Sequence, residues 1–150
     1  MESITESVDV RVPLEIAYAK WRDISSFPQY MDGVHDVREL DGIHSHWVAS
    51  AGGFVREFDA TIVEQQPGRR ITWVCESGLM LGGSVTFESR SEDRTAIAVE
   101  LRIDPQGLIE NLAEKTGILH RMVVADLYRF KNALEAADPQ QPRTKELHTP

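Results

Sequence analysis

His120 is the residue whose type and position come closest to chemistry in this sequence. On a helical wheel of about 100° per residue it lies within about 40° of the centre of an apolar stripe, one turn from Thr116 and from Val123. A neutral imidazole enclosed beside that stripe could act as a general base or hydrogen-bond a ligand oxygen. The alternative is a packed histidine bonded to a neighbouring strand or to water. Both interpretations stay open.

Arg56 is the second candidate, because it belongs to the charged stretch VREFDATIVEQQPGRRITW, residues 55–73. Alternate residues of a strand share a face, so Arg56 lies with Phe58 on the apolar side while Glu57 and Asp59 lie on the other. Carboxylates are rarely buried without partners, so we expect Glu57 and Asp59 to be solvated rather than to form a catalytic pair. Arg56 either reaches solvent by its long stem or binds an anionic or enolic group at a pocket mouth.

Aromatic residues supply the third kind of candidate. Trp47 and Trp73 are flat walls with an N–H donor, suited equally to an aromatic ligand and to a core. Tyr30 and Met31 lie in a short helical segment that could form the entrance of a pocket.

Metal, cofactor and nucleophile chemistry find no support in the residue spacing. His44 and His46 share a strand face, but no third ligand follows at a recognisable spacing and no CxxC or HExxH pattern is present. We expect no metal and no cofactor. Cys75 is the single cysteine; it has no activating partner in sequence and forms no internal disulfide, in keeping with a reducing cytoplasm.

The composition is that of one globular domain. The chain has 150 residues, 41% of them hydrophobic, and 16 basic against 24 acidic residues give a net charge of −8. That charge opposes binding to nucleic acid and to anionic lipid. The N-terminus has no signal-peptide pattern, and no apolar run approaches the roughly 18 residues of a membrane span. We expect a cytoplasmic protein without stable membrane insertion.

The elements that must position these residues follow from periodicity. Residues 4–12 alternate as a half-buried strand, with Glu6 an exception on the apolar face, and two short helices are expected after Pro13 and near Pro28. Further strands are expected at residues 34–40, 43–50, 54–64, 70–76, 80–89 and 95–104. A long helix over residues 105–136 and a disordered tail, residues 137–150, complete the chain.

Short turns between these strands predict an antiparallel meander. Such a sheet would leave one face exposed unless it curls, and the last helix can cover that face. The space between a curved sheet and a long helix is where a ligand would bind.

Several segments together resemble a known family: VDVRVPLEIAYAKWRDISSFPQYMDGVHDV, then HW, REFDATIVEQQPGRRITW, GSVTF and IDPQGLIENL. They are similar to the polyketide cyclase/dehydrase branch of the START-like (SRPBCC, helix-grip) superfamily, most of all to its small stand-alone bacterial members, over residues 4–134. The resemblance implies an α+β helix-grip fold (START/Bet v 1-like), in which a curved antiparallel seven-stranded sheet surrounds a long C-terminal helix and two short helices follow the first strand. It implies a START-like ligand-binding domain over residues 1–136, with a pocket for lipids, sterols, polyketides or other apolar molecules.

The resemblance supports the fold more strongly than it supports the cyclase reaction. Where aromatase/cyclase members carry a pocket serine, arginine and tyrosine, this chain has Ala60, Ile62 and Val34, which weighs against cyclase chemistry. Phe58 replaces the tryptophan usual in close relatives and keeps the aromatic wall.

The sequence therefore predicts a pocket for a polyketide-, aromatic- or lipid-like molecule. The protein is either a polyketide cyclase, aromatase or dehydratase, with His120 as its catalytic residue, or a carrier without catalysis; a protein- or ribosome-interaction module is the last alternative. We expect a monomer or homodimer. The predicted ligand-binding residues are Tyr30, Trp47, Arg56, Phe58, Trp73, Thr116, Leu119 and Val123.

Overall fold

Seven strands and a long C-terminal helix make up the architecture of a computed structural model, which describes residues 2–51, 54–75, 80–103 and 112–137. The elements, in chain order, are β1 (Glu2–Val10), α1 (Leu14–Arg22), the 3₁₀ helix η1 (Ile24–Gln29), β2 (Val34–Glu39), β3 (His44–Ala51), β4 (Phe54–Gln66), β5 (Arg70–Cys75), β6 (Met80–Ser91), β7 (Arg94–Ile103) and α2 (Leu112–Ala137). The predicted α+β helix-grip fold is confirmed.

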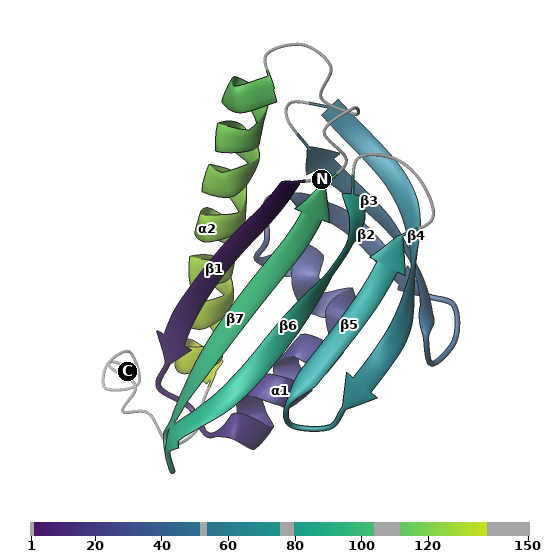
Figure 1. Cartoon of the computed structure of the whole chain (residues 1–150). Helices are drawn as coiled ribbons and strands as arrows, with labels where there is room; N and C mark the ends of the chain where they lie inside the picture. Colours follow the sequence, from purple (N-terminus) through teal and green to yellow (C-terminus); the bar gives the residue numbers. More distant parts are fainter. Residues whose placement is uncertain (1, 52–53, 76–79, 104–111, 138–150) are drawn as a thin grey trace, which may run out of the picture.

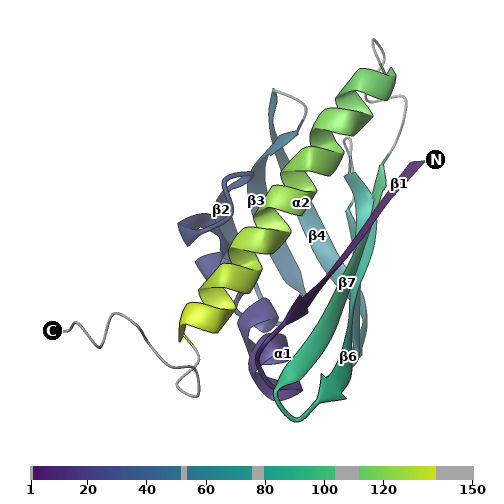
Figure 2. The same cartoon turned by 90° about the vertical axis from the view of Figure 1, so that its left-hand side faces the viewer.

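All seven strands form one antiparallel sheet in the order β1-β7-β6-β5-β4-β3-β2. Strands β2 to β7 follow one another as the predicted meander, and β1 closes the far edge by pairing with β7. The sheet curls around α2, which runs obliquely across its inner face, while α1 lies against the end of the sheet where β1 leaves it (Figures 1 and 2).

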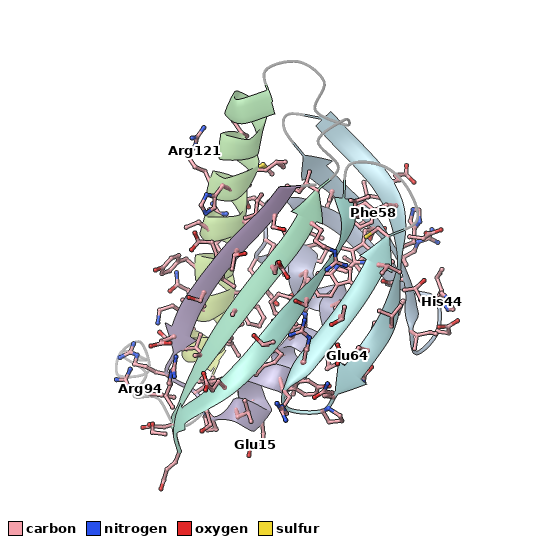
Figure 3. The ribbon with its side chains drawn as sticks, in the orientation of Figure 1. Glu15, His44, Phe58, Glu64, Arg94 and Arg121 are labelled. Atoms are coloured by element: carbon pink, nitrogen blue, oxygen red, sulfur yellow. The ribbon has the colours of Figure 1, made fainter. Side chains whose placement is uncertain are left out.

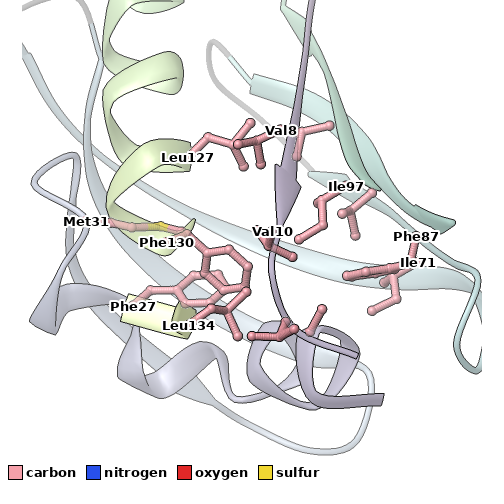
Figure 4. Packing of buried hydrophobic residues seen from close by; sticks show 14 residues of the cluster. Val8, Val10, Phe27, Met31, Ile71, Phe87, Ile97, Leu127, Phe130 and Leu134 are labelled. Carbon is pink, nitrogen blue, oxygen red and sulfur yellow. The ribbon is translucent and has the colours of Figure 1, made fainter. Parts of the chain in front are cut away.

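One end of the space inside the sheet is tightly packed. Phe130 and Leu134 of α2 are 0% and 2% exposed, and Val10 of β1 is 0% exposed. The rings of Trp21 and Phe27, from α1 and η1, stand edge-on to Phe130 at centroid distances of 5.2 Å and 6.2 Å. Figure 4 shows Val10, Phe27, Phe130 and Leu134 converging from the strands and the helices. The two short helices therefore fill one end of the curled sheet.

The second short helix differs from its prediction. It begins at Ile24 rather than near Pro28, and Pro28 lies inside it. Asp23 explains the earlier start, because it ends α1 and at once begins the next turn: its N–H bonds to carbonyls of α1 and its own carbonyl accepts from Ser26 N at 3.1 Å.

The strand predictions agree with the structure to within two residues at the ends that it describes. The expected start of the last helix falls on residues 104–111, and the expected tail falls, apart from Ala137 at the end of α2, on residues 138–150; both lie outside the described residues. Among the helices that the structure describes, none is long and apolar enough to cross a membrane.

Candidate functional site

A cavity of about 260 Å³ lies between the inner face of the sheet and α2. Its sheet side carries Trp47, Phe58 and Trp73, one from each of three neighbouring strands, and its helix side carries Leu119 and Val123. The structure thus places five of the eight predicted ligand-binding residues around one cavity, three on the sheet side and two on the helix side. That they contact a ligand stays a prediction.

The aromatic wall is built by strand register. Trp47 on β3 lies directly opposite Phe58 on β4, and their rings stack with centroids 6.1 Å apart and planes 7° from parallel. The indole N–H of Trp47 donates to Ser45 Oγ at 2.8 Å. This hydrogen bond fixes the orientation of the ring and satisfies the indole nitrogen without a ligand. A flat apolar surface is left facing the cavity.

Trp73 depends on the glycine beside it. Trp73 on β5 pairs with Gly83 on β6, and a Cβ added at Gly83 would lie 2.8 Å from Cζ2 of the Trp73 ring. Gly82 has φ +153°, and a Cβ there would lie 2.5 Å from the Trp73 carbonyl oxygen. Gly83 therefore lets the indole lie close over β6, and Gly82 lets the backbones of β5 and β6 approach each other beside it.

His120 is not among the residues that line the cavity, and of its two interpretations the structure agrees with a histidine bonded to a neighbouring strand. Its side chain is 47% exposed and its Nε2 is hydrogen-bonded to Glu6 Oε2 of β1. The reason is that α2 crosses the edge strand β1, so the flank of the apolar stripe meets that strand rather than the cavity. Figure 3 shows the next residue, Arg121, pointing away from the sheet. The two polar residues on apolar faces, Glu6 and His120, are therefore partners.

Tyr30 is half-buried but does not belong to the wall. Its ring packs against Phe27 and Phe130, its hydroxyl lies 3.4 Å from Ser26 Oγ, and Lys20 Nζ lies 5.2 Å from the ring centroid. Burial raises the pKa of Tyr30 to about 12, so the phenol is protonated at neutral pH. Tyr30 thus supports the packed end.

Two predicted residues are placed only by their backbone. Arg56 lies opposite Ala49 in the ladder between β3 and β4, and Thr116 lies in the first turns of α2. Their side chains lie outside the described part of the structure.

Glu57 and Asp59 are exposed, as expected, with 67% and 54% of their side chains in solvent. They bind His46 between them, at 3.0 Å and 2.7 Å, on the outer side of the two strands. Hydrogen bonds to Asp59 and then to Glu57 raise the pKa of His46 above its usual value. This is an exposed charge cluster, and Glu57 is its one member that also borders the cavity.

Cys75 is half-buried, and burial governs its ionisation. Burial raises the pKa of the Cys75 thiol to about 11, so the sulfur is neutral at pH 7 and is a poor nucleophile. Within the described residues, no group of three His, Cys, Asp or Glu side chains is placed to hold a metal ion.

Asp126 lines the cavity and was missed by the sequence analysis. Its carboxylate accepts hydrogen bonds from the backbone N–H groups of Asp32 and Gly33, at 3.0 Å and 3.1 Å, and from Arg129 Nη1 at 3.0 Å. Burial is the largest influence on its pKa and raises it, while these bonds lower it. Because both of its carboxylate oxygens accept hydrogen bonds, Asp126 links the turn before β2 to α2.

Arg22, also missed, ends α1 and lines the cavity. Its Nη1 is buried and has no hydrogen-bond partner among the described residues. Leaving a buried donor unsatisfied costs about 1–3 kcal/mol, and more for a charged group. Its place directly after Trp21, at the end of an amphipathic helix, was the only sequence signal for it.

The comparisons with known proteins agree with this geometry. Residues 10–131 match the family model described as polyketide cyclase / dehydrase and lipid transport. The chain is 35% identical, over 136 residues, to an uncharacterized 17.2 kDa protein in the melC2-rnhH intergenic region of Streptomyces lincolnensis, covering 90% of this chain and 91% of that relative.

Two solved structures illustrate the fold. The Zhui aromatase/cyclase from Streptomyces sp. R1128 superimposes with a TM-score of 0.73 at 14% identity, covering 89% of this chain and 93% of that one. A START superfamily protein from Mycobacterium smegmatis gives 0.68 at 15% identity, covering 88% and 98%. At these identities the likeness shows the fold alone.

Proposed function

The chain belongs to the polyketide cyclase/dehydrase and lipid transport family, and on that premise we propose that it binds a compact apolar, aromatic molecule in the cavity between the sheet and α2. The observation that carries the proposal is the wall of Trp47, Phe58 and Trp73, whose positions are set by strand register and which faces a space that no side chain of the described residues fills. Ligand pockets are mostly apolar with few polar groups, as here.

The volume limits the size of the ligand. Drug-sized ligands occupy pockets of about 300–1,000 Å³, and benzene is accommodated by an apolar cavity of about 150 Å³. A cavity of about 260 Å³ suits two or three fused rings, or a short polyketide of that bulk. Exposed residues of the β2–β3 turn, Asp41 to His44, also line the cavity and give it an opening to solvent.

Binding without catalysis is the form of this proposal that the geometry favours. His120 is bonded to Glu6 on the rim of the sheet, and Tyr30 packs outside the wall. The protein would then carry its ligand, as a monomer or homodimer in the cytoplasm, without nucleic acid as partner; the single cysteine and the net charge of −8 support this setting.

Cyclisation or dehydration of the bound ligand is the second candidate. The family description includes it, and Ser45 offers one group for it. Ser45 is 8% exposed, lines the cavity and accepts the bond from Trp47 Nε1, so its own proton can be donated to a ligand carbonyl.

The test is native mass spectrometry of the protein purified from its own host, followed by extraction and identification of the bound molecule. We expect one compact aromatic or polyketide compound per chain, lost when the cavity is blocked by Ala60→Leu. Incubating its linear precursor with wild type and with Ser45→Ala then separates a carrier from a cyclase. A protein that is empty, and that binds no apolar dye, would contradict the proposal.

A further inference from the structure

We propose that Arg22 anchors the ligand, and that the ligand carries an oxygen acceptor, strongest as a carboxylate or enolate, at the end that meets this guanidinium. The inference rests on the proposed function and names the polar chemistry of the same cavity.

The position of Arg22 is the first argument. It is the last residue of α1, the helix that fills the packed end, and it lines the cavity together with Trp21. A guanidinium keeps its charge in proteins and presents five N–H donors in a planar fork suited to carboxylates. A ligand resting on the aromatic wall can therefore meet a fixed positive group.

The unused donor is the second argument. Nη1 of Arg22 is shielded from solvent and bonds to nothing in the described part of the chain, where Arg22 also forms no ion pair. The end of α1 does not need this side chain, because the backbone N–H of Asp23 already bonds to the carbonyls of Ala19 and Lys20. A buried charged donor without a partner among the described residues calls for an acceptor, and an oxygen of a bound ligand would supply one.

The acidic residues around the cavity do not satisfy Arg22. Three of the four that line it hold other groups: Asp126 binds Arg129, Asp41 binds His44 and Glu57 binds His46. The fourth, Glu39, is exposed. The cavity therefore combines an apolar wall with a cation whose buried nitrogen is free to bond, which fits an aromatic acid or enolate better than a hydrocarbon.

The experiment compares three probes of equal ring size by isothermal titration calorimetry: 2-naphthoate, 2-acetylnaphthalene and 2-ethylnaphthalene. We expect wild type to bind 2-naphthoate about ten- to a hundredfold more tightly than 2-ethylnaphthalene, with the ketone between them, because a hydrogen bond to a charged group is worth that factor. Arg22→Met keeps length and apolar bulk and should remove the preference while 2-ethylnaphthalene still binds.

A matched control removes a charge from the same helical turn outside the cavity. Lys20 lies over the Tyr30 ring, so Lys20→Met should leave the order of the three affinities unchanged. If wild type binds the three probes equally, or if Arg22→Met retains the preference for 2-naphthoate, the anchoring role is wrong although the cavity is real. If wild type binds none of them, the proposed function itself fails, and this inference fails with it.

Discussion

The two ends of the space inside the sheet are built from similar residue types and differ in what fills them. At the packed end, α1 and η1 insert Trp21 and Phe27 against Phe130, and the side chains there are nearly all inaccessible. At the cavity end, Trp47, Phe58 and Trp73 of the sheet remain half-buried around about 260 Å³, which Trp21 of α1 borders from the packed end. Apolar residues thus serve stability at one end and are left available for a ligand at the other.

The largest loss of stability should come from truncating a buried side chain at the packed end. Phe130→Ala removes a ring that is 0% exposed and should lower the free energy of unfolding by about 3–5 kcal/mol, measured by urea denaturation. Tyr128→Ala, at a site 49% exposed on the same helix, should change it by less than about 0.5 kcal/mol. Equal losses in the two variants would contradict the contrast between the ends.

Replacing an alanine by leucine should change the free energy of unfolding in opposite directions at the two ends. Ala17 is 0% exposed in the packed cluster, so Ala17→Leu overpacks it and should cost about 1–3 kcal/mol in thermal or urea unfolding. Ala60 lines the cavity, so Ala60→Leu fills space and should leave stability equal or raise it by about 0.5–2 kcal/mol. A comparable loss at Ala60 would show that the cavity end is as tightly packed as the other.

Truncating the aromatic wall should affect binding more than folding. Phe58→Ala removes the ring stacked on Trp47 and should cost about 1–2 kcal/mol of stability, while weakening a bound aromatic ligand roughly tenfold. Val63→Ala, at an exposed site on the same strand, serves as the control for both calorimetry and unfolding. Unchanged affinity in Phe58→Ala would remove this residue from the binding site.

The smallest change in stability should come from His46, which lies on the outer side of the same strands. The pKa of His46 is raised from 6.5 by Asp59 and Glu57, so its contribution to stability is present below about pH 6.5 and is lost as pH rises through the higher folded-state pKa. His46→Gln should flatten that part of the pH dependence of unfolding and leave ligand affinity unchanged. An NMR titration that placed the pKa of His46 below 6.5 would contradict this.

Local patterns predicted the fold well and the cavity in part. Strand alternation placed Phe58 on the apolar face of its strand, and the structure brings it together with Trp47 and Trp73, which the sequence offered equally to a ligand and to a core. Periodicity could not place His120, because its orientation depends on where α2 crosses β1 and meets Glu6. Asp126 gives a similar lesson: its role depends on backbone N–H groups 93 and 94 residues away, which no local spacing reveals.

The cavity as a binding site is tested most directly by NMR, because all three tryptophans of the chain line it. Wild type and Ala60→Leu would be titrated with 2-ethylnaphthalene while the indole N–H signals of Trp21, Trp47 and Trp73 are followed. Saturable shifts of these signals in wild type, and their loss in a folded Ala60→Leu protein, are the predicted result. Signals that do not move in wild type, or that move equally in both proteins, would contradict the account.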